Sequence, residues 1–194
     1  MIPGILLAAG RSERYGRHKL LEKDAEGIPL AQRAIAPYGL LDQVVAVIPE
    51  GHAALRTLFE AISAAVVEAP SGAQLADSLR AGIMSTLWAD GWIVGLADMP
   101  AVTAATVSAL HRALREGAIM VACRYQGRRG NPVGFSRGML ADLLALKGDQ
   151  GARRLLAQQA GKVQWLDVDD PGILLDIDVP SDWNRVIKPE ASKP

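Results

Sequence analysis

The sequence predicts one α/β domain with a mainly parallel mixed sheet, and three observations carry that prediction. The chain has 194 residues, which is close to the size of a single domain of roughly 150 residues. Its hydrophobic content of 49% and charged content of 22% fit a folded chain with its own core. Short apolar runs alternate with longer helical patterns, as in βαβ units.

The apolar runs predict five strands, at residues 2–9, 43–48, 65–68, 92–97 and 119–125. Their nearly unbroken Val, Ile and Ala content fits a sheet covered on both faces. Helices are expected at 29–38, 53–63, 73–88, 103–116, 138–146 and 151–159. Leu75, Leu79, Ile83 and Leu87 form one stripe that should face the sheet. Glycines and prolines crowd into residues 127–138, which predicts a functional loop or a short strand with tight turns.

Charge and cysteine content exclude several classes of protein. Lys+Arg and Asp+Glu both number 21, so the broad positive surface of a nucleic-acid-binding or membrane-surface protein is not expected. Cys123 is the single cysteine and lies in an expected strand, where it is interpreted as a small hydrophobe rather than a nucleophile. The first apolar run lacks a preceding Lys or Arg and is short, so we expect no signal peptide and a cytoplasmic protein.

The first motif that carries chemistry spans residues 7–20, where a strand leads into a loop with Gly10, Gly16 and four cations. Open α/β folds bind ligands at the carboxyl ends of their strands, so this loop predicts a phosphate site. Arg14 and Lys19 could neutralise a triphosphate there. The spacing fits neither GxGxxG nor a Walker A motif. The alternative is a charged loop in solvent.

Two further motifs place carboxylates near that loop. Asp98 follows the apolar run 92–97 and precedes Pro100, so it should lie at the same edge of the sheet. A carboxylate beside bound phosphates suits Mg²⁺. Alternatively, Asp98 caps the helix at 103–116. Asp176 and Asp178 stand two residues apart, so one of them could be a second metal ligand, unless they only end a strand before a helix starting at Pro180.

Together these motifs resemble the molybdopterin nucleotidyltransferases, over residues 5–183. The resemblance rests on LAAG at residues 7–10 with the lysine at position 19, on LADMP at 96–100 and on DIDVPSD at 176–182. It implies a three-layer α/β/α Rossmann-like fold of the nucleotide-diphospho-sugar transferase type. LAAG looks like the cytidylyl-transferring members, because guanylyl-transferring relatives typically carry Gly in place of Ala9 and Asp in place of His18.

The resemblance also implies roles for individual residues. The residues expected at the reaction are Arg14, Lys19 and Asp98. The nucleotide site is expected to comprise Leu7, Ala8, Ala9, Gly10, Arg11, Ser12, Arg14, Lys19 and Ser78. The pterin substrate site is expected to comprise Arg129, Gly130, Asn131, Pro132, Asp149 and Gly151, although many relatives have His at the position of Asn131. The metal ligands are expected to be Asp98 and Asp178, with Mg²⁺ as the cofactor.

The implied reaction transfers CMP from CTP to the terminal phosphate of molybdopterin and releases pyrophosphate. The expected domain is residues 1–187, with a tail at 188–194. The expected partners are CTP, a molybdopterin-type pterin phosphate and a client molybdoenzyme, with no nucleic acid and no membrane. The alternatives are guanylyl transfer, a sugar or alcohol phosphate acceptor, or a carrier that holds the pterin cofactor without transferring a nucleotide. The missing GxGxxG spacing argues against a dinucleotide-dependent dehydrogenase.

Overall fold

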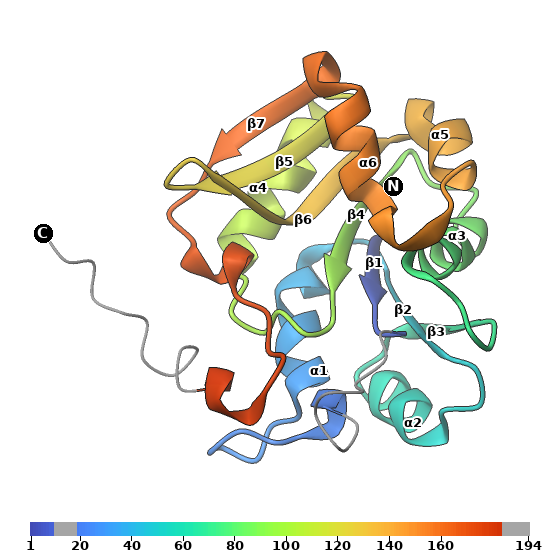
Figure 1. Ribbon diagram of the computed structural model, residues 1–194, viewed down its shortest axis with the longest axis vertical. Coiled ribbons are helices and arrows are strands. Elements are labelled where there is room, and N and C mark those ends of the chain that lie inside the picture. The colour runs from blue at the N-terminus through green and yellow to red at the C-terminus, as the bar shows by residue number, and fades with distance from the viewer. Residues whose placement is uncertain (10–18, 184–194) are drawn as a thin grey trace, which may run out of the picture.

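The computed structural model describes residues 1–9 and 19–183, and within them the chain forms a single seven-stranded sheet (Figure 1). The strand order is β3-β2-β1-β4-β6-β5-β7. β6 runs antiparallel to its neighbours β4 and β5, while the remaining strand pairs are parallel. The strands are β1 (Gly4–Leu7), β2 (Val44–Pro49), β3 (Ala65–Ala69), β4 (Gly91–Leu96), β5 (Met120–Tyr125), β6 (Arg128–Ser136) and β7 (Val163–Asp167). The mainly parallel mixed sheet expected from the sequence is confirmed.

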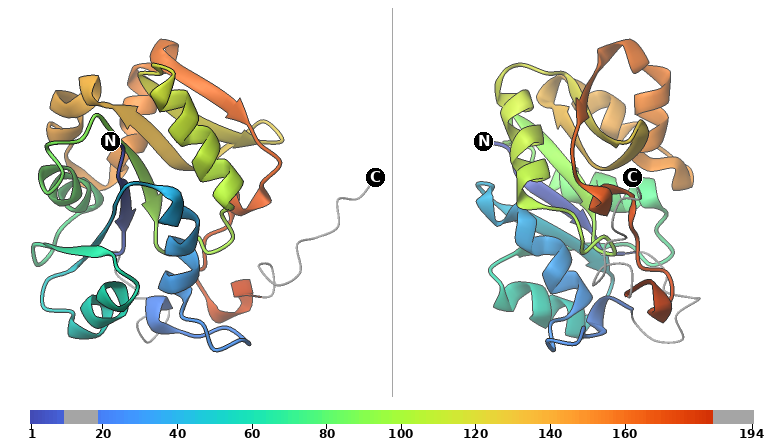
Figure 2. Two further views of the ribbon diagram at one scale, coloured as in Figure 1. Left: turned by 180° about the vertical axis from the view of Figure 1, so that it is seen from behind. Right: turned by 90° about the vertical axis from the view of Figure 1, so that its left-hand side faces the viewer.

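Helices cover both faces of the sheet and complete the three layers (Figure 2). One apolar cluster joins the sheet to α1 (Leu30–Ile35), α2 (Ala53–Ala61) and α4 (Ala104–Arg115). The other joins it to α3 (Leu75–Met84), α5 (Leu140–Leu144) and α6 (Gly151–Gln158). Successive strand residues enter opposite clusters, as Leu6 and Leu7 do, because side chains alternate along a strand. Among the described residues, no helix is both long and apolar enough to cross a membrane.

Strands β6 and β7 are the main departure from the predicted elements. The glycine- and proline-rich segment forms a nine-residue strand, and the register of its pairing with β5 shifts between Ala122 and Arg124. That irregularity accommodates Pro132, which cannot donate a ladder hydrogen bond in a central strand. The edge strand β7 was not predicted. It has a single neighbouring strand, β5, and two of its five residues, Gln164 and Asp167, are exposed, so it lacks the unbroken apolar run by which the other strands were predicted.

The predicted helix 73–88 was too long at its carboxyl end. α3 ends at Met84, and the hydroxyl of Thr86 donates to the carbonyl oxygens of Gly82 and Ile83 at 3.0 and 3.2 Å. Thr86 in turn accepts from the buried indole of Trp92 at 2.9 Å, which fixes the chain as it turns toward β4. Leu87 therefore lies outside the helical stripe and is 39% exposed.

Gly95 in β4 sits against a buried tyrosine, so an added methyl group should destabilise the fold. A Cβ atom at Gly95 would lie 1.9 Å from the Tyr38 hydroxyl oxygen and 2.6 Å from Cζ of the same ring. We expect Gly95→Ala to lower the free energy of unfolding by about 1–3 kcal/mol, as overpacking of a dense core does. Urea denaturation measures this. Gly39→Ala is the control, because nothing lies within 4 Å of its added Cβ; equal stability of both variants would contradict the packing.

Cys123 is fully buried in β5, which confirms its interpretation as a small hydrophobe. Burial, and second the negative charge of Asp170, raise the pKa of the Cys123 thiol to about 12. Because the thiolate is the reactive form, we expect no reaction with a disulfide reagent such as DTNB in the native protein and one thiol per chain in guanidinium. Rapid stoichiometric labelling of the native protein at pH 8 would contradict this.

Candidate active site

The candidate site forms where the central strands β1 and β4 end. Beyond these ends, the amide of Ala97 donates to the carbonyl oxygen of Leu7 at 3.0 Å, and Asp98 follows in the turn after β4. The amide of Ile177 donates to the carbonyl oxygen of Asp98 at 2.9 Å, which brings the C-terminal segment to the same place. A short 3₁₀ helix, Lys19–Leu21, supplies the third component. Residues far apart in the sequence therefore meet at the carboxyl edge of the sheet, where α/β folds bind ligands.

Lys19 joins these segments through its ammonium group. Its Nζ donates to Oδ2 of Asp98 at 2.8 Å, to the carbonyl oxygen of Ile177 at 2.9 Å and to Oδ1 of Asp178 at 3.1 Å. The side chain of Lys19 is 10% exposed, whereas those of Asp98 and Asp178 are 26% and 51% exposed. An ammonium has three donors, so these acceptors use all of them.

The charges of this cluster favour the ionised lysine. Burial lowers the pKa of Lys19, but the charges and hydrogen bonds of Asp98 and Asp178 raise it more, so the net pKa lies above its usual value. Asp98 retains one unusual atom: its Oδ1 is buried without a hydrogen-bond partner in the part of the chain that the structure describes. A buried carboxylate oxygen without a partner is costly and is a candidate to bind a cation.

A cavity of about 510 Å³ opens beside this cluster. Its wall includes the end of β1, the cluster residues Lys19 and Asp98, and the start of α3. Helix α3 begins after Gln74. The backbone amide of Gln74 donates to Oδ2 of Asp77 at 3.0 Å, which holds the loop before the helix in place. The lining residues are Leu7, Ala8, Ala9, Lys19, Leu20, Gly72, Ala73, Gln74, Leu75, Ser78, Leu96, Asp98 and Asp149.

A second cavity, of about 980 Å³, shares part of its wall with the first. Leu7, Leu75, Leu96 and Asp149 line both cavities. The rest of the second wall combines an apolar surface from β4, β6 and α6 with basic side chains. Its other lining residues are Leu79, Val94, Arg129, Asn131, Val133, Ala152, Arg153, Arg154, Leu156, Ala157 and Gln158.

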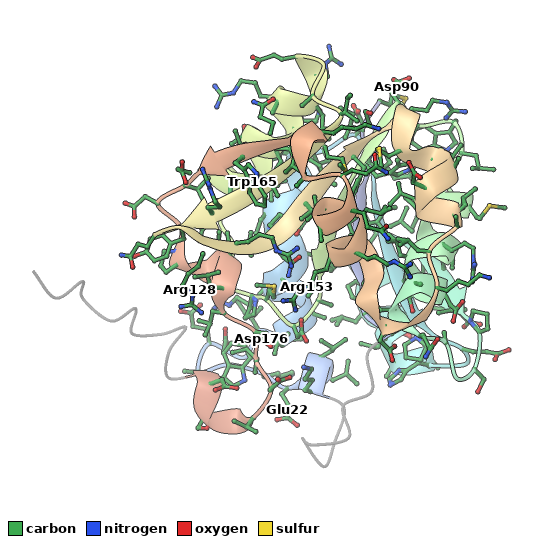
Figure 3. All side chains as sticks on the ribbon, turned by 45° about the horizontal axis from the view of Figure 1, so that its top comes forward. Glu22, Asp90, Arg128, Arg153, Trp165 and Asp176 are labelled. Atoms are coloured by element: carbon green, nitrogen blue, oxygen red, sulfur yellow. The ribbon has the colours of Figure 1, made fainter. Side chains whose placement is uncertain are left out.

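Arg129 and Arg153 are two of the three arginines that line the second cavity. Burial, and second the positive charge of Arg153, lower the pKa of Arg129. Among the described residues, neither arginine has an ion pair with a carboxylate. Figure 3 shows the side chain of Arg153 on α6, whereas the labelled Arg128 belongs to the start of β6. Two neighbouring guanidinium groups without a counter-ion suit an anionic ligand, above all a phosphate.

The structure brings together part of the predicted nucleotide and metal site. Leu7, Ala8, Ala9, Lys19, Ser78 and Asp98 line the first cavity, and Asp178 contacts Lys19. Asp98 is not the cap of α4, because the hydroxyl of Thr103 accepts from the amide of Thr106 there. Both aspartates are exposed, and Asp178 is the one of the pair that contacts Lys19. Gly10, Arg11, Ser12 and Arg14 lie outside the described residues.

The predicted pterin-site residues divide into two groups. Arg129, Asn131 and Asp149 line the second cavity. Gly130, Pro132 and Gly151 are buried and do not line either of the two cavities. A Cβ atom at Gly130 would lie 2.2 Å from the carbonyl oxygen of Ile173, so this glycine allows the segment after β7 to pack closely on β6.

Several cavity residues were not predicted as site residues. Gln74 and Leu75 come from the start of α3, and Arg153, Arg154 and Gln158 come from α6. The side-chain amide of Gln74 lies 3.5 Å from Oδ2 of Asp149, at the boundary of the two cavities. The resemblance did point to Arg153, since it ends the GDQGAR segment at residues 148–153, and a similar segment lines the pterin pocket in cytidylyl-transferring relatives. Leu75 carried no such signal, because it fits the packing stripe of α3. Leu79 fits the same stripe, although it also belongs to the segment 78–80, which resembles a family segment near the nucleotide.

The carboxylates present fit a hard divalent cation. Within the described residues, there is no group of three or more His, Cys, Asp or Glu side chains arranged to hold a metal. Mg²⁺, however, usually takes only one or two protein carboxylates together with substrate phosphates and water. Asp98, with its unpartnered Oδ1, and Asp178 meet that requirement.

Comparisons with known proteins agree with this architecture. Residues 4–163 match the family model described as the MobA-like NTP transferase domain. The purine catabolism protein PucB of Bacillus subtilis (strain 168) is 30% identical over an alignment of 197 positions, which covers 94% of each protein. The crystal structure of Rv0371c from Mycobacterium tuberculosis H37Rv superposes with a TM-score of 0.84 at 28% identity, covering 96% of this chain and 97% of that one.

Two other solved structures extend the comparison. A complex of Rv0371c with manganese has a TM-score of 0.79 at 27% identity and covers 95% of this chain and 97% of that one. The molybdopterin-guanine dinucleotide biosynthesis protein A of Archaeoglobus fulgidus shares the fold, with a TM-score of 0.65 at 14% identity over 95% of this chain and 96% of that one. The family match over residues 4–163 and the relative at 30% identity lead to one conclusion: the chain belongs to the family of MobA-like NTP transferases.

Proposed function

We propose that this protein is a molybdenum cofactor cytidylyltransferase, which transfers CMP from CTP to the terminal phosphate of molybdopterin. The observation that carries the proposal is the pair of cavities with a common wall at Leu7, Leu75, Leu96 and Asp149. A transferase must hold two substrates so that the reacting atoms are neighbours, and two joined cavities provide that arrangement.

The first cavity is proposed as the nucleotide site. It lies against the end of β1, where the sequence LAAG resembles the cytidylyl-transferring members of the family. Lys19 and Asp98 lie on its wall, and we assign the triphosphate to this side. We assign Arg14 to the triphosphate as well, and Gly10, Arg11 and Ser12 to the nucleotide, on the resemblance of residues 7–20 alone.

The second cavity is proposed as the acceptor site. Its apolar wall, with Leu79, Val94 and Leu156, suits one face of a flat heterocycle. Arg129 and Arg153 suit the phosphate that the heterocycle carries. We propose that Asn131 and Asp149 contact the pterin's polar edge, since both side chains belong to this wall.

The reaction then requires positioning and charge neutralisation rather than a protein nucleophile. An oxygen of the acceptor phosphate, which is anionic near neutral pH, forms a bond to the α-phosphorus of CTP. The bond from that phosphorus to the oxygen bridging it to the β-phosphorus breaks, and pyrophosphate leaves. Lys19 neutralises charge of the triphosphate in the first cavity, and Arg129 and Arg153 neutralise charge of the acceptor phosphate in the second.

Asp98 and Asp178 are the proposed ligands of Mg²⁺. When bound, the metal ion supplies electrostatic stabilisation of the triphosphate charge that develops as pyrophosphate leaves. The complex of Rv0371c with manganese supports a divalent metal in a relative at 27% identity. Our assignment of Asp98 depends on its place at the cavity wall and on its unpartnered Oδ1.

The test is a panel of the four ribonucleoside triphosphates, each supplied with Mg²⁺ and molybdopterin, with pyrophosphate release as the readout. We expect turnover with CTP and at least tenfold less with the other three. Turnover with GTP in preference to CTP would overturn the choice of base. Binding of molybdopterin without turnover of any nucleotide would instead identify a cofactor carrier.

A further inference from the structure

The position of Lys19 has a consequence for how the metal is bound. Asp98 offers two carboxylate oxygens, of which one is already engaged and the other has no hydrogen-bond partner but is buried. Oδ2 accepts from the ammonium of Lys19 at 2.8 Å, and Oδ1 is buried. The side chain of Asp98 is nevertheless 26% exposed and lines the first cavity. A cation that approaches Asp98 from the cavity therefore meets the oxygen that Lys19 already holds.

Asp178 is engaged in the same way. Its Oδ1 accepts from the same ammonium at 3.1 Å, so a single positive charge is shared between the two carboxylates. Asp178 is also held by its backbone, because its amide donates to Oδ2 of Asp182 at 2.9 Å. The carboxylates thus sit on fixed turns, whereas Lys19 reaches them through a flexible stem of four carbons. Of the three side chains, the lysine is the one that can withdraw with little change to the backbone.

We propose that Lys19 is an internal counter-ion that occupies the metal ligands until a nucleotide arrives. The ammonium and a divalent cation compete for the same carboxylate oxygens, since two positive charges a few ångströms apart repel each other strongly at a partly buried site. A triphosphate provides new acceptors for the ammonium. Once Lys19 has moved to the phosphates, Asp98 and Asp178 are free for the metal. The protein therefore binds free metal weakly and the metal–nucleotide pair together.

This inference rests on the proposed nucleotide and metal site, and it makes metal and nucleotide binding cooperative. Each ligand removes the obstacle to the other, so the coupling must be equal in both directions. On this inference, the ammonium of Lys19 binds two sets of acceptors, one after the other. In the structure its ammonium has carboxylate and carbonyl acceptors, and phosphate oxygens replace them in the loaded site.

The test measures Mn²⁺ binding without nucleotide or pterin, by electron paramagnetic resonance of free Mn²⁺. We expect Lys19→Met, which keeps much of the apolar stem and removes the charge, to bind Mn²⁺ at least tenfold more tightly than the wild type. Lys162→Met is the matched control, because Lys162 is exposed in the 3₁₀ helix before β7 and its ammonium donates to Oε1 of Gln159, away from the carboxylates of the cluster. The double variant Lys19→Met/Asp98→Asn should lose the gain.

Equal or weaker Mn²⁺ binding by Lys19→Met would overturn the inference, as would a gain that survives in the double variant. Because neither CTP nor molybdopterin is used, these outcomes are independent of whether the protein transfers CMP. If Lys19→Met does not fold, nuclear magnetic resonance of the Lys19 ammonium in the wild type decides. Its protected signal should persist with millimolar Mg²⁺ alone and change when a CTP analogue with a methylene between the α- and β-phosphorus is added. A signal lost with Mg²⁺ alone, or unchanged by both, would overturn the inference.

Discussion

Replacing Asp98 by Asn is expected to lower kcat/KM for nucleotidyl transfer by at least about 10²–10³-fold, the loss that follows removal of one preorganised charge-stabilising group. The amide keeps the shape of the carboxylate but removes its charge, and with it the proposed metal ligand. The fold should persist, since Lys19 retains the carbonyl oxygen of Ile177 and the carboxylate of Asp178 as acceptors. Steady-state pyrophosphate release measures the rate, and circular dichroism with a thermal melt measures the fold.

Asp176→Asn is the matched control for that experiment. Asp176 lies two residues before Asp178 in the same segment and is also exposed, but within the described residues it makes no hydrogen bond or ion pair with Lys19. We expect its rate to remain within about twofold of the wild type, as for a surface side chain without a specific partner. Near-normal turnover of Asp98→Asn would remove Asp98 from the mechanism, and equal losses in both variants would point to general damage of the site.

Replacing Arg129 by Met is expected to weaken binding of the acceptor and to leave binding of the nucleotide unchanged. A hydrogen bond to a charged group contributes about 1.5–3 kcal/mol, which corresponds to roughly a 10–100-fold rise in KM for molybdopterin. KM for CTP should stay unchanged, because Arg129 lines the second cavity and not the first. Titration of each substrate at a saturating concentration of the other separates the two effects.

Arg128→Met is the control, since Arg128 is the adjacent residue of β6, is exposed and does not line either of the two cavities. Its kinetics should match the wild type. An equal effect of both substitutions would mean that general positive charge near the hairpin attracts the acceptor. A rise in KM for CTP with Arg129→Met would exchange the roles of the two cavities.

The central strands β1 and β4 were predictable, because the apolar runs that form them are local features of the sequence. Residues 2–9 and 92–97 are apolar runs long enough for buried strands, and β1 and β4 lie within them. The glycine- and proline-rich run predicted a loop or a short strand, whereas β6 is stabilised by pairing with two neighbours that lie elsewhere in the sequence. Trp165 of β7 shows a similar dependence, because its ring packs under the guanidinium of Arg124 from the neighbouring strand, with 5.3 Å between Cζ and the ring centre.

The candidate site, too, could be predicted from the sequence only in part. A carboxylate after an apolar strand and a lysine in a charged loop are visible in the sequence, and the structure places Lys19 and Asp98 2.8 Å apart although 79 positions separate them. What the sequence could not show is that this lysine contacts both Asp98 and Asp178. That partnership depends on the carbonyl oxygen of Ile177, a backbone group that no side-chain pattern reveals.

In the proposed reaction, CMP passes from the nucleotide cavity to an acceptor phosphate in the adjoining cavity. CTP labelled with ³²P at the α-phosphorus tests it most directly, with molybdopterin present or absent. We expect release of unlabelled pyrophosphate only when the acceptor is present, and transfer of the label to a pterin dinucleotide. One labelled dinucleotide should form for each pyrophosphate released. Pyrophosphate release at the same rate without the acceptor, or label recovered as free CMP, would contradict it.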